Sequence, residues 1–377
     1  MRFVLALLAT ATIALAAATP ADAFDDGLAR TPPMGWSSWN RFGCDIGEQT
    51  VRETADALVV GGMRDAGYRY VNVDDCWMAP TRDAFGRLRA DPWRFPGGIP
   101  ALADYVHARG LRLGLYTSIG ARTCQGRPGL AGHESGDLAR IASWGADYLK
   151  VDFCGANGAV RGDPAPAYAR VRDLIGQSGR KLVLGICTWG QGLPWRWGPR
   201  IGHMWRVTGD IRPEWRWVLK IAGRNDLRAR HAGPGGWNDP DSLEVGNRGM
   251  TVREQRAHFG LWALMAAPLI AGNDVRHMSR VTRRILLNRE LIAVDQDRLG
   301  SQGHRVRRGL HEVWIKRLAG RARAVLLLNR GRRTAVLRFG IGRARRVRDL
   351  WRHRWRSSAR TLRVRVRGHA AAMFRVP

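Results

Sequence analysis

The sequence predicts an α/β protein, a (β/α)8 TIM barrel followed by a small C-terminal antiparallel β-sandwich domain. From Thr31 to about Gln296, short apolar runs alternate with longer segments of helical spacing, which is the pattern of a parallel sheet. Polar residues gather directly after the apolar runs, where a barrel carries its chemistry. After Gln296 the pattern changes to short strands separated by turn residues.

The predicted strands and helices of the first part follow from hydrophobic periodicity. The strands are 70–73, 113–116, 148–151 and 182–186, and the helices are 51–65, 99–109 and 136–144. A glycine closes each helix, as a left-handed C-cap prefers. A doubly wound sheet would place its site at the same edge. No Gly-x-Gly-x-x-Gly motif follows a strand in the early chain, however, which weakens a nucleotide-binding interpretation.

The segments outside the barrel have different compositions. Residues 1–23 predict a secretory signal peptide, with Arg2 before an apolar run and a cleavage site after Ala23, although an uncleaved anchor helix is the alternative. We therefore expect a catalytic barrel at 24–298 and an Arg-rich sandwich at 299–377, whose strands include Trp314, 325–328 and 335–337. The protein should be exported to the periplasm or the exterior, without a membrane span in its mature form.

The five cysteines are compatible with export, because an oxidising compartment permits disulfides. They are Cys44, Cys76, Cys124, Cys154 and Cys187. Their odd number leaves at least one thiol free or paired between chains, and spacing alone does not give the connectivity. None belongs to a Cys-x-x-Cys pair, which disfavours a structural zinc site.

Positive charge concentrates at the C-terminus. Residues 301–377 contain 23 Lys+Arg and two acids, a net charge of +21 out of +30 for the chain. Such a field attracts anionic partners. The arginines alternate with apolar residues in 362–367, however, as in strands with one wet face. A solvated surface is therefore one interpretation, and contact with an anionic polymer or a cell surface is the other. No motif indicates specific nucleic-acid recognition, and a monomer and a homodimer are equally compatible with the sequence.

Two aspartates are candidates for hydrolysis of a glycosidic bond, a reaction that needs one carboxylate to attack and another to protonate the leaving oxygen. Asp152 directly follows a predicted strand and lies near Lys150, whose ammonium group should lower the pKa of the carboxyl and keep it ionised. Asp210 follows Trp205 to Gly209, and a partly apolar wall should raise its pKa. A helix N-cap is the alternative role of an aspartate at a strand end.

Asp74 and Asp75 form a tandem acid pair after another predicted strand. Their side chains point in different directions, so each can bind a separate sugar hydroxyl. A divalent metal is the competing interpretation, but no His-x-His and no third acid lies nearby, and we predict no metal and no cofactor. Aromatic rings on the same loops suit the apolar faces of sugars, although core packing is the alternative for each ring. These tryptophans are Trp36, Trp39, Trp77, Trp189, Trp205 and Trp237.

Six segments together resemble one enzyme family, glycoside hydrolase family 27, which contains α-galactosidases and α-N-acetylgalactosaminidases. The segments lie in family order and are 28–40, 74–77, 116–120, 150–154, 205–211 and 235–241. The resemblance runs from about residue 28 to 303, over the whole predicted barrel.

The resemblance implies a retaining mechanism without metal or organic cofactor, acting on an α-galactoside. Asp152 would attack the anomeric carbon, and Asp210 would protonate the leaving oxygen and then activate water. The residues that would line the galactose pocket are Trp39, Asp74, Asp75, Tyr116, Lys150, Cys187, Trp189, Arg206 and Asp241. The implied disulfides are Cys44–Cys76 and Cys124–Cys154, which leaves Cys187 as a free thiol beside the sugar.

Two positions depart from the family pattern. Many relatives have Glu where this chain has Thr188, near the sugar 2-substituent, and the family often has Met at Ser242. The smaller Thr188 could leave room for an N-acetyl group, so N-acetylgalactosamine is the alternative to the galactose that we predict. The Asp74–Asp75 pair argues against a β-L-arabinopyranoside. A non-catalytic carbohydrate-binding relative would have lost Asp152 or Asp210, and both are present. An enzyme on another scaffold that uses a metal would be inhibited by chelators.

Overall fold

The computed structural model describes residues 24–377 apart from 157–159, 161, 344 and 359, and the predicted signal peptide 1–23 lies outside the described residues. Eight parallel strands form one sheet in the order β7-β6-β5-β4-β3-β2-β1-β8. Their bounds are β1 Met34–Ser37, β2 Tyr70–Asn72, β3 Arg112–Ser118, β4 Tyr148–Asp152, β5 Val183–Cys187, β6 Met204–Arg206, β7 Trp237–Asp239 and β8 Leu269–Ala271. The predicted (β/α)8 barrel is confirmed.

The sheet closes on itself through a short connection between its two ends. Leu243, which follows β7, forms a parallel bridge with Ala271 of β8. The Leu243 amide donates to the carbonyl of Ile270 at 2.7 Å, and its carbonyl accepts from the amide of Gly272 at 2.9 Å. Because all eight strands are parallel, their carboxyl ends meet at one rim, which is where a barrel builds its site.

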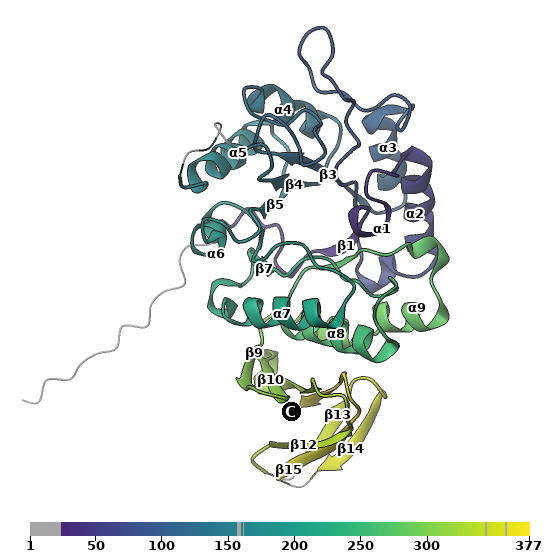
Figure 1. The fold of residues 1–377 in the computed structure, drawn as a ribbon, viewed down its shortest axis with the longest axis vertical. Helices are drawn as coiled ribbons and strands as arrows, with labels where there is room; N and C mark the ends of the chain where they lie inside the picture. Colours follow the sequence, from purple (N-terminus) through teal and green to yellow (C-terminus); the bar gives the residue numbers. More distant parts are fainter. Residues whose placement is uncertain (1–23, 157–159, 161, 344, 359) are drawn as a thin grey trace, which may run out of the picture.

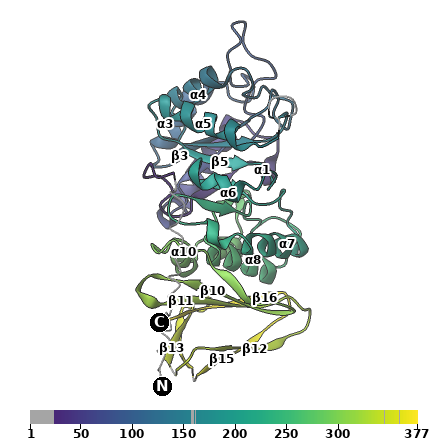
Figure 2. The same ribbon diagram turned by 90° about the vertical axis from the view of Figure 1, so that its left-hand side faces the viewer.

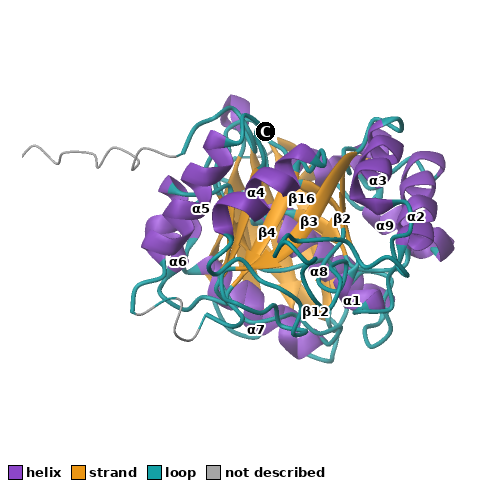
Figure 3. Ribbon diagram, turned by 90° about the horizontal axis from the view of Figure 1, so that it is seen from above, coloured by secondary structure: helices purple, strands orange, loops and turns teal. Residues whose placement is uncertain are grey.

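Ten α-helices of the described residues cover the strands (Figures 1 and 3). Their bounds are α1 Trp39–Phe42, α2 Glu48–Val60, α3 Gly98–His107, α4 Glu134–Ser143, α5 Ala165–Gln177, α6 Pro194–Trp197, α7 Trp215–Asp226, α8 Val252–Leu264, α9 Arg280–Leu286 and α10 Arg289–Asp295. The predicted helix at 51–65 is shorter than expected, because Gly62 adopts a left-handed φ of 77° that ends it. Left-handed glycines do follow these segments, at Gly67, Gly110 and Gly145.

Aromatic and aliphatic side chains plug the amino-terminal end of the barrel. The plug is a buried cluster of Tyr70, Tyr148, Val183, Met204, Trp237 and Ala266. Five of these six residues are the first residues of their strands. The interior is therefore packed at that end, and polar side chains at the strand ends can face a cavity that opens at the other.

The C-terminal domain consists of two antiparallel sheets. Its strands are β9 His304–Arg307, β10 His311–Arg317, β11 Arg323–Asn329, β12 Ala335–Gly340, β13 Arg345–Asp349, β14 Arg354–Ser358, β15 Thr361–Val366 and β16 Ala370–Val376. A six-stranded sheet, β14-β13-β16-β11-β10-β9, lies on the barrel, and β12 and β15 pair on its outer side (Figure 2). The predicted sandwich is confirmed. The predicted boundary at 298/299 falls between α10 and β9.

The apolar run 325–328 is continuous because both faces of its strand are buried. Leu326 and Leu328 belong to the main core shared with the barrel, whereas Val325 and Leu327 belong to the core between the two sheets. Side chains alternate along a strand, so one strand serves both cores. Within the described residues, no helix has the length and apolarity to cross a membrane.

Gly35 of β1 tests how tightly the barrel packs. A Cβ at this position would overlap the backbone oxygen of Tyr70 on the neighbouring strand, which cannot move without disturbing the sheet. We expect Gly35→Ala to lower the free energy of unfolding by about 2–3 kcal/mol. The matched control is Gly136→Ala in α4, where a Cβ meets nothing within 4 Å and should stabilise the helix by up to about 1 kcal/mol. Denaturant unfolding measures both, and equal stabilities would contradict the expected packing.

Candidate active site

A cavity of about 350 Å³ opens at the carboxyl ends of the strands. Seven of the nine predicted sugar-binding residues line it, namely Trp39, Asp74, Tyr116, Lys150, Cys187, Arg206 and Asp241. The predicted acid/base Asp210 also lies in its wall. Tyr148 and Met204 of the amino-terminal plug line it too, so the cavity reaches down to the packed end of the barrel.

Asp152 is the last residue of β4 and touches two of the residues in the cavity wall. Its Oδ2 accepts a hydrogen bond from the hydroxyl of Tyr116 at 3.2 Å and lies 4.0 Å from Nζ of Lys150. Its Oδ1 accepts from the amide of Phe153 at 2.9 Å. The parallel register of β3 and β4 pairs Tyr116 with Lys150, which brings these groups together.

Burial has the largest effect on Asp152 and raises the pKa of its carboxyl above the usual range. Lys150 and the Phe153 amide lower this pKa, as expected for Lys150, but they do not outweigh the loss of solvent. The expectation of a lowered pKa is therefore wrong in its net direction. The carboxyl is only 4 % exposed, and this burial depends on tertiary packing that no local sequence pattern reports.

Asp210 lies in a loop four residues beyond β6 and faces Arg206. Its Oδ1 is 2.9 Å from Nη2 of Arg206, and its side chain is 61 % exposed. Partial burial tends to raise the pKa of Asp210, but the charges of Arg206 and Lys150 outweigh that effect, and the pKa lies below the usual range. The expectation of a raised pKa at Asp210 is thus also wrong, because the neighbouring group is a guanidinium and not an apolar wall.

Arg206 contacts the two loops of the site that carry Asp210 and Asp241. Besides Asp210, its Nη2 contacts Oδ2 of Asp241 at 2.9 Å, and its Nη1 donates to Sγ of Cys187 at 3.7 Å. Among the described residues, its Nε is buried without a hydrogen-bond partner. Asp241 also accepts from the amide of Ile211 at 2.8 Å, so one carboxylate fixes the loop that carries Asp210. These contacts hold the loops after β6 and β7 against each other.

The two members of the tandem pair Asp74–Asp75 lie in different surroundings. Asp74 lines the cavity, and its Oδ2 accepts from Nζ of Lys150 at 2.8 Å. Asp75 is not part of the cavity wall, and its oxygens accept from the amides of Cys76 at 2.7 Å and Gln125 at 3.0 Å. Asp75 therefore connects the loops around the site, and direct contact between its carboxylate and a sugar stays a prediction.

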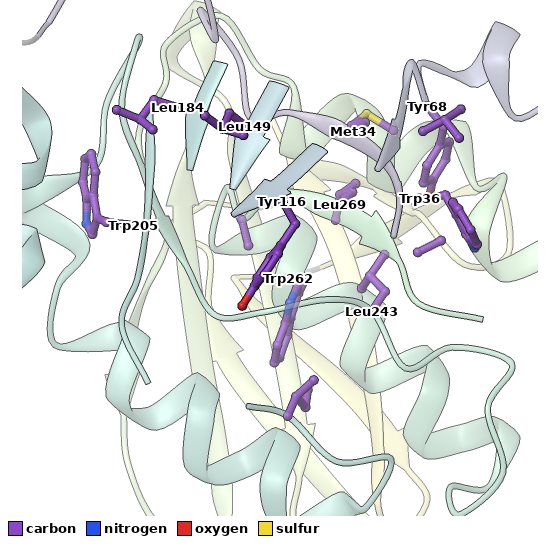
Figure 4. Packing of buried hydrophobic residues seen from close by; sticks show 14 of the residues in the cluster. Met34, Trp36, Tyr68, Tyr116, Leu149, Leu184, Trp205, Leu243, Trp262 and Leu269 are labelled. Atoms are coloured by element: carbon purple, nitrogen blue, oxygen red, sulfur yellow. The ribbon is translucent and has the colours of Figure 1, made fainter. Parts of the chain in front are cut away.

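Most of the candidate tryptophans belong to the core. Trp36, Trp77, Trp205 and Trp237 are completely buried, and Trp36 and Trp205 are among the packed side chains in Figure 4. Trp39 lines the cavity, whereas Trp189 is half-buried and outside its wall. Of the six rings, Trp39 alone lines the cavity, and its role as a surface for a sugar stays a prediction. Sequence position does not distinguish a ring that points into the barrel wall from one that points into the cavity.

Two disulfides flank the site. Cys44 pairs with Cys76, and Cys124 pairs with Cys154, with Cα atoms 5.2 and 5.0 Å apart. The buried Cys187 is free, so the pairing implied by the resemblance is confirmed. Within the described part of the chain, Cys124, Asp152 and Cys154 are the group of metal-ligating side chains close enough to share an ion. The two sulfurs are joined to each other and offer no thiolate, so the group does not fit a metal.

Three residues in the loops around the site hold unusual backbone conformations. Cys76, Trp189 and Asp241 have φ values of 76°, 53° and 78°. Non-glycine residues rarely adopt this left-handed region, and such strain gathers at functional sites. At Asp241 it is supported by two hydrogen bonds of 2.8 Å, from its amide to Asp239 and from the Ser242 amide to its carboxylate.

Two further acids, Asp239 and Glu244, lie in the cavity wall and were not among the residues predicted from the sequence. Burial raises the pKa of Asp239 to about 6 and that of Glu244 to about 7. Glu244 accepts hydrogen bonds from Asn40 at 2.6 Å and Asn247 at 2.5 Å. Asp239 ends β7 two residues before Asp241, and this spacing at a strand end was the available signal.

Thr188 does not line the cavity. It is completely buried, and its hydroxyl donates to the carbonyl of Gln191 at 2.8 Å. Ser242, the other departure from the family pattern, does lie in the cavity wall. A difference in sugar selectivity could therefore arise from Ser242 by direct contact, whereas Thr188 would have to act through the shape of its loop.

Comparison with known proteins places this geometry in a family. Residues 31–297 match the family model of α-galactosidase A, and residues 308–376 match that of the α-galactosidase C-terminal β-sandwich domain. The chain is 45 % identical to α-galactosidase A of Cellvibrio japonicus, over 93 % of this chain and 92 % of that protein. It is 47 % identical to α-galactosidase of rice, over 93 % and 86 %.

Solved structures agree with the sequence comparisons. α-Galactosidase I of Mortierella vinacea superimposes with a TM-score of 0.91 at 34 % identity, over 93 % of this chain and 98 % of that one. Because both family models match, together span most of the chain, and coincide with the barrel and the sandwich, the chain belongs to glycoside hydrolase family 27, the α-galactosidase family.

Proposed function

We propose that this protein hydrolyses terminal α-linked galactose with retention of configuration, with Asp152 as nucleophile and Asp210 as acid/base. The observation that carries the proposal is that Asp210 lines the cavity, that Asp152 contacts Tyr116 and Lys150 of its wall, and that one pair of cations acts on both acids. Lys150 lies 4.0 Å from Asp152, Arg206 lies 2.9 Å from Asp210, and both cations act on the pKa values of both acids. A retaining glycosidase needs two carboxyl groups on either side of one anomeric centre.

The sugar would be held by charged groups that already pair with each other. Asp74 and Lys150 form one pair at 2.8 Å, and Asp241 and Arg206 form another at 2.9 Å. A hydroxyl group both donates and accepts, so it can join such a pair without leaving either charge unsatisfied. Trp39 supplies an aromatic surface for the apolar face of the ring.

The reaction would take place in two displacements. In the first, Oδ2 or Oδ1 of Asp152 attacks the anomeric carbon, the bond to the leaving oxygen breaks, and Asp210 gives its proton to that oxygen. In the second, Asp210 removes a proton from water, whose oxygen attacks the anomeric carbon and releases Asp152 as a carboxylate. The product has the α configuration of the substrate, and both acids return to their starting states.

The protonation state of Asp210 in the free protein differs from the one that the reaction requires, and substrate binding can change it. Asp210 must be protonated to act first, yet in the free protein Arg206 lowers its pKa. Its side chain is largely exposed, so a bound sugar would remove water from it and raise that pKa. The hydroxyl of Tyr116 and the Phe153 amide stabilise the ionised form of Asp152, which the attack requires.

The remaining expectations concern the protein outside the site. We propose that the chain is exported, which is supported by the apolar segment before Ala23 and by the two disulfides. We further propose that the protein, with a net charge of +30, contacts an anionic polymer. A monomer and a homodimer both remain compatible with the proposal.

Azide rescue tests the two catalytic roles. Asp152→Ala and Asp210→Ala should each reduce kcat on natural α-galactoside substrates by about 10³-fold or more, because each removes the group that performs a step of the reaction. With nitrophenyl α-galactoside and azide, Asp152→Ala should yield β-galactosyl azide, since azide replaces the nucleophile. Asp210→Ala should yield α-galactosyl azide, since azide attacks the covalent adduct.

The control for this experiment is Asp173→Asn, an exposed carboxylate paired with Arg172, which should leave kcat unchanged. Product configuration is determined by NMR. The proposed assignment is wrong if the two azide products are exchanged between the variants, or if either variant keeps wild-type kcat.

The pH profile tests the hydrogen bond between Tyr116 and Asp152. Activity requires ionised Asp152, so kcat/KM should fall as the pH drops through its raised pKa. Tyr116→Phe removes a donor to the ionised form, raises that pKa further, and should move the acidic limb to higher pH by roughly 0.5–1. Tyr168→Phe is the matched control, because its hydroxyl donates to the Val151 carbonyl. An equal shift in both variants would argue against the specific contact.

Sugar selectivity tests the choice of substrate. We expect nitrophenyl α-galactoside to be preferred over the α-N-acetylgalactosaminide by about 100-fold in kcat/KM, because an acetyl group would leave buried polar groups of the cavity without hydroxyl partners. Thr188→Ser should leave this ratio unchanged within a few-fold, since the side chain is outside the cavity wall. A clear preference for the acetylated sugar would refute the galactose assignment.

A further inference from the structure

A second concave site lies on the outer surface, away from the catalytic cavity. It is a groove of about 700 Å³ between the helices α8 to α10 and the turn that joins β13 to β14. Five arginines line it, namely Arg256, Arg280, Arg283, Arg284 and Arg289. It shares no lining residue with the catalytic cavity. Figure 1 shows α8 and α9 on the side of the barrel that faces the C-terminal domain. We name it the arginine groove.

The five guanidinium groups have no carboxylate to neutralise them. In the part of the chain that the structure describes, none of the five forms an ion pair. The one acid in the groove, Glu290, is already bound by Arg348 at 2.6 Å and by His353 at 2.8 Å. The arginine groove therefore keeps a concentrated positive charge within a concave surface, which focuses the field on whatever enters it.

Helix stability explains only part of this set, because Arg283 and Arg284 lie in the last turn of α9, where the helix dipole favours cations. Arg280 is the first residue of α9 and Arg289 is the first residue of α10, where the helix dipole disfavours a cation. Arg280 also has Arg283 and Arg284 three and four residues further along, and like charges at these spacings repel each other. The positions of Arg280 and Arg289 and the repulsion among the arginines of α9 are unfavourable, and a bound anion would relieve them.

We propose that the arginine groove binds an acidic polysaccharide through its carboxylate or sulfate groups. Guanidinium groups bind such oxyanions in a bidentate geometry, and five of them around one groove can contact several anionic groups of one polymer chain. Trp351 also lines the groove, with Arg256 5.0 Å from its ring centre, and gives a sugar ring an apolar contact.

The observations favour a glycan over the other polyanions. A bilayer surface is flat and does not enter a groove, and the sequence contains no nucleic-acid recognition motif. The choice of a glycan also rests on the proposed galactosidase function, because a bound acidic polysaccharide would keep the enzyme near galactose-bearing polymers. The arginine groove also places the expected contact with an anionic polymer in a different part of the protein. It is formed mainly by helices of the barrel, whereas the sequence pointed to the C-terminal domain.

The test compares two triple variants of the full chain with equal loss of charge. Arg280→Gln, Arg283→Gln and Arg284→Gln together remove three charges from the arginine groove. Arg338→Gln, Arg363→Gln and Arg365→Gln remove three exposed charges from β12 and β15. Binding is measured to dextran sulfate and polygalacturonate, with neutral dextran, double-stranded DNA and anionic vesicles for comparison, at several salt concentrations.

We expect the groove variant to bind at least one acidic polysaccharide about tenfold or more weakly than the unmodified protein. The slope of log Kd against log salt should fall by up to about 3, one for each lost contact. The control variant should bind within about twofold of the unmodified protein. Whether dextran sulfate or polygalacturonate binds more tightly distinguishes sulfate from carboxylate groups.

Several results would overturn the proposal. These are no binding of either acidic polysaccharide by the unmodified protein, equal weakening in the two variants, or tighter binding of DNA or vesicles that is lost in the groove variant. Hydrolysis of nitrophenyl α-galactoside is measured in parallel and should be the same in both variants, since neither alters the cavity. If the unmodified protein does not hydrolyse this substrate, the proposed function is wrong, but the binding measurements still test the arginine groove.

Discussion

The buried guanidinium of Arg206 is the group around which the site is organised. It is 3 % exposed, and it holds Asp210 and Asp241 at 2.9 Å each. A buried charge without partners costs several kcal/mol, so only the loss of both acids would leave an uncompensated cation at the end of β6. The same contacts tie together the loops after β6 and β7, because Asp241 also binds the amide of Ile211. Lys150 likewise contacts two acids, Asp74 at 2.8 Å and Asp152 at 4.0 Å. The charges that we propose to bind the sugar are thus also the charges that hold the loops.

The cavity sets the protonation of its acids through burial as much as through charge. Asp152 has its pKa raised in spite of Lys150, and Asp210 has its pKa lowered in spite of partial burial. Asp239 and Glu244, with pKa values of about 6 and about 7, add two carboxyl groups that can carry protons near neutral pH. A site that encloses this many acids can remain stable because some of them are protonated and the rest are paired with cations. A bound sugar would change this distribution most at Asp210, which is the exposed member.

The C-terminal domain is coupled to the barrel by a sheet that is buried on both faces. Leu326 and Leu328 extend the core of the barrel, while Val325 and Leu327 form the interior of the sandwich. The arginines of this domain largely occupy the remaining solvent-facing positions, such as Arg363 and Arg365 on β15. Those positions give a diffuse positive surface. In the arginine groove, by contrast, α9 and α10 direct several cations toward one concave surface, where neighbouring fields add. Net charge alone does not distinguish these two cases.

The sequence by itself determined the alternation of strands and helices, the two-domain organisation and the candidate acids, because these depend on local periodicity and on the rule that parallel strands carry polar residues at their carboxyl ends. The tertiary structure alone decided which candidates reach the cavity. Trp39 lines it while Trp205 lies in the core, and Asp74 faces it while Asp75 binds backbone amides. It also reversed the expected pKa directions of Asp152 and Asp210. The physical reason is that burial and electrostatic fields are sums over atoms from several strands and loops, and neighbours along the chain contribute only part of each sum.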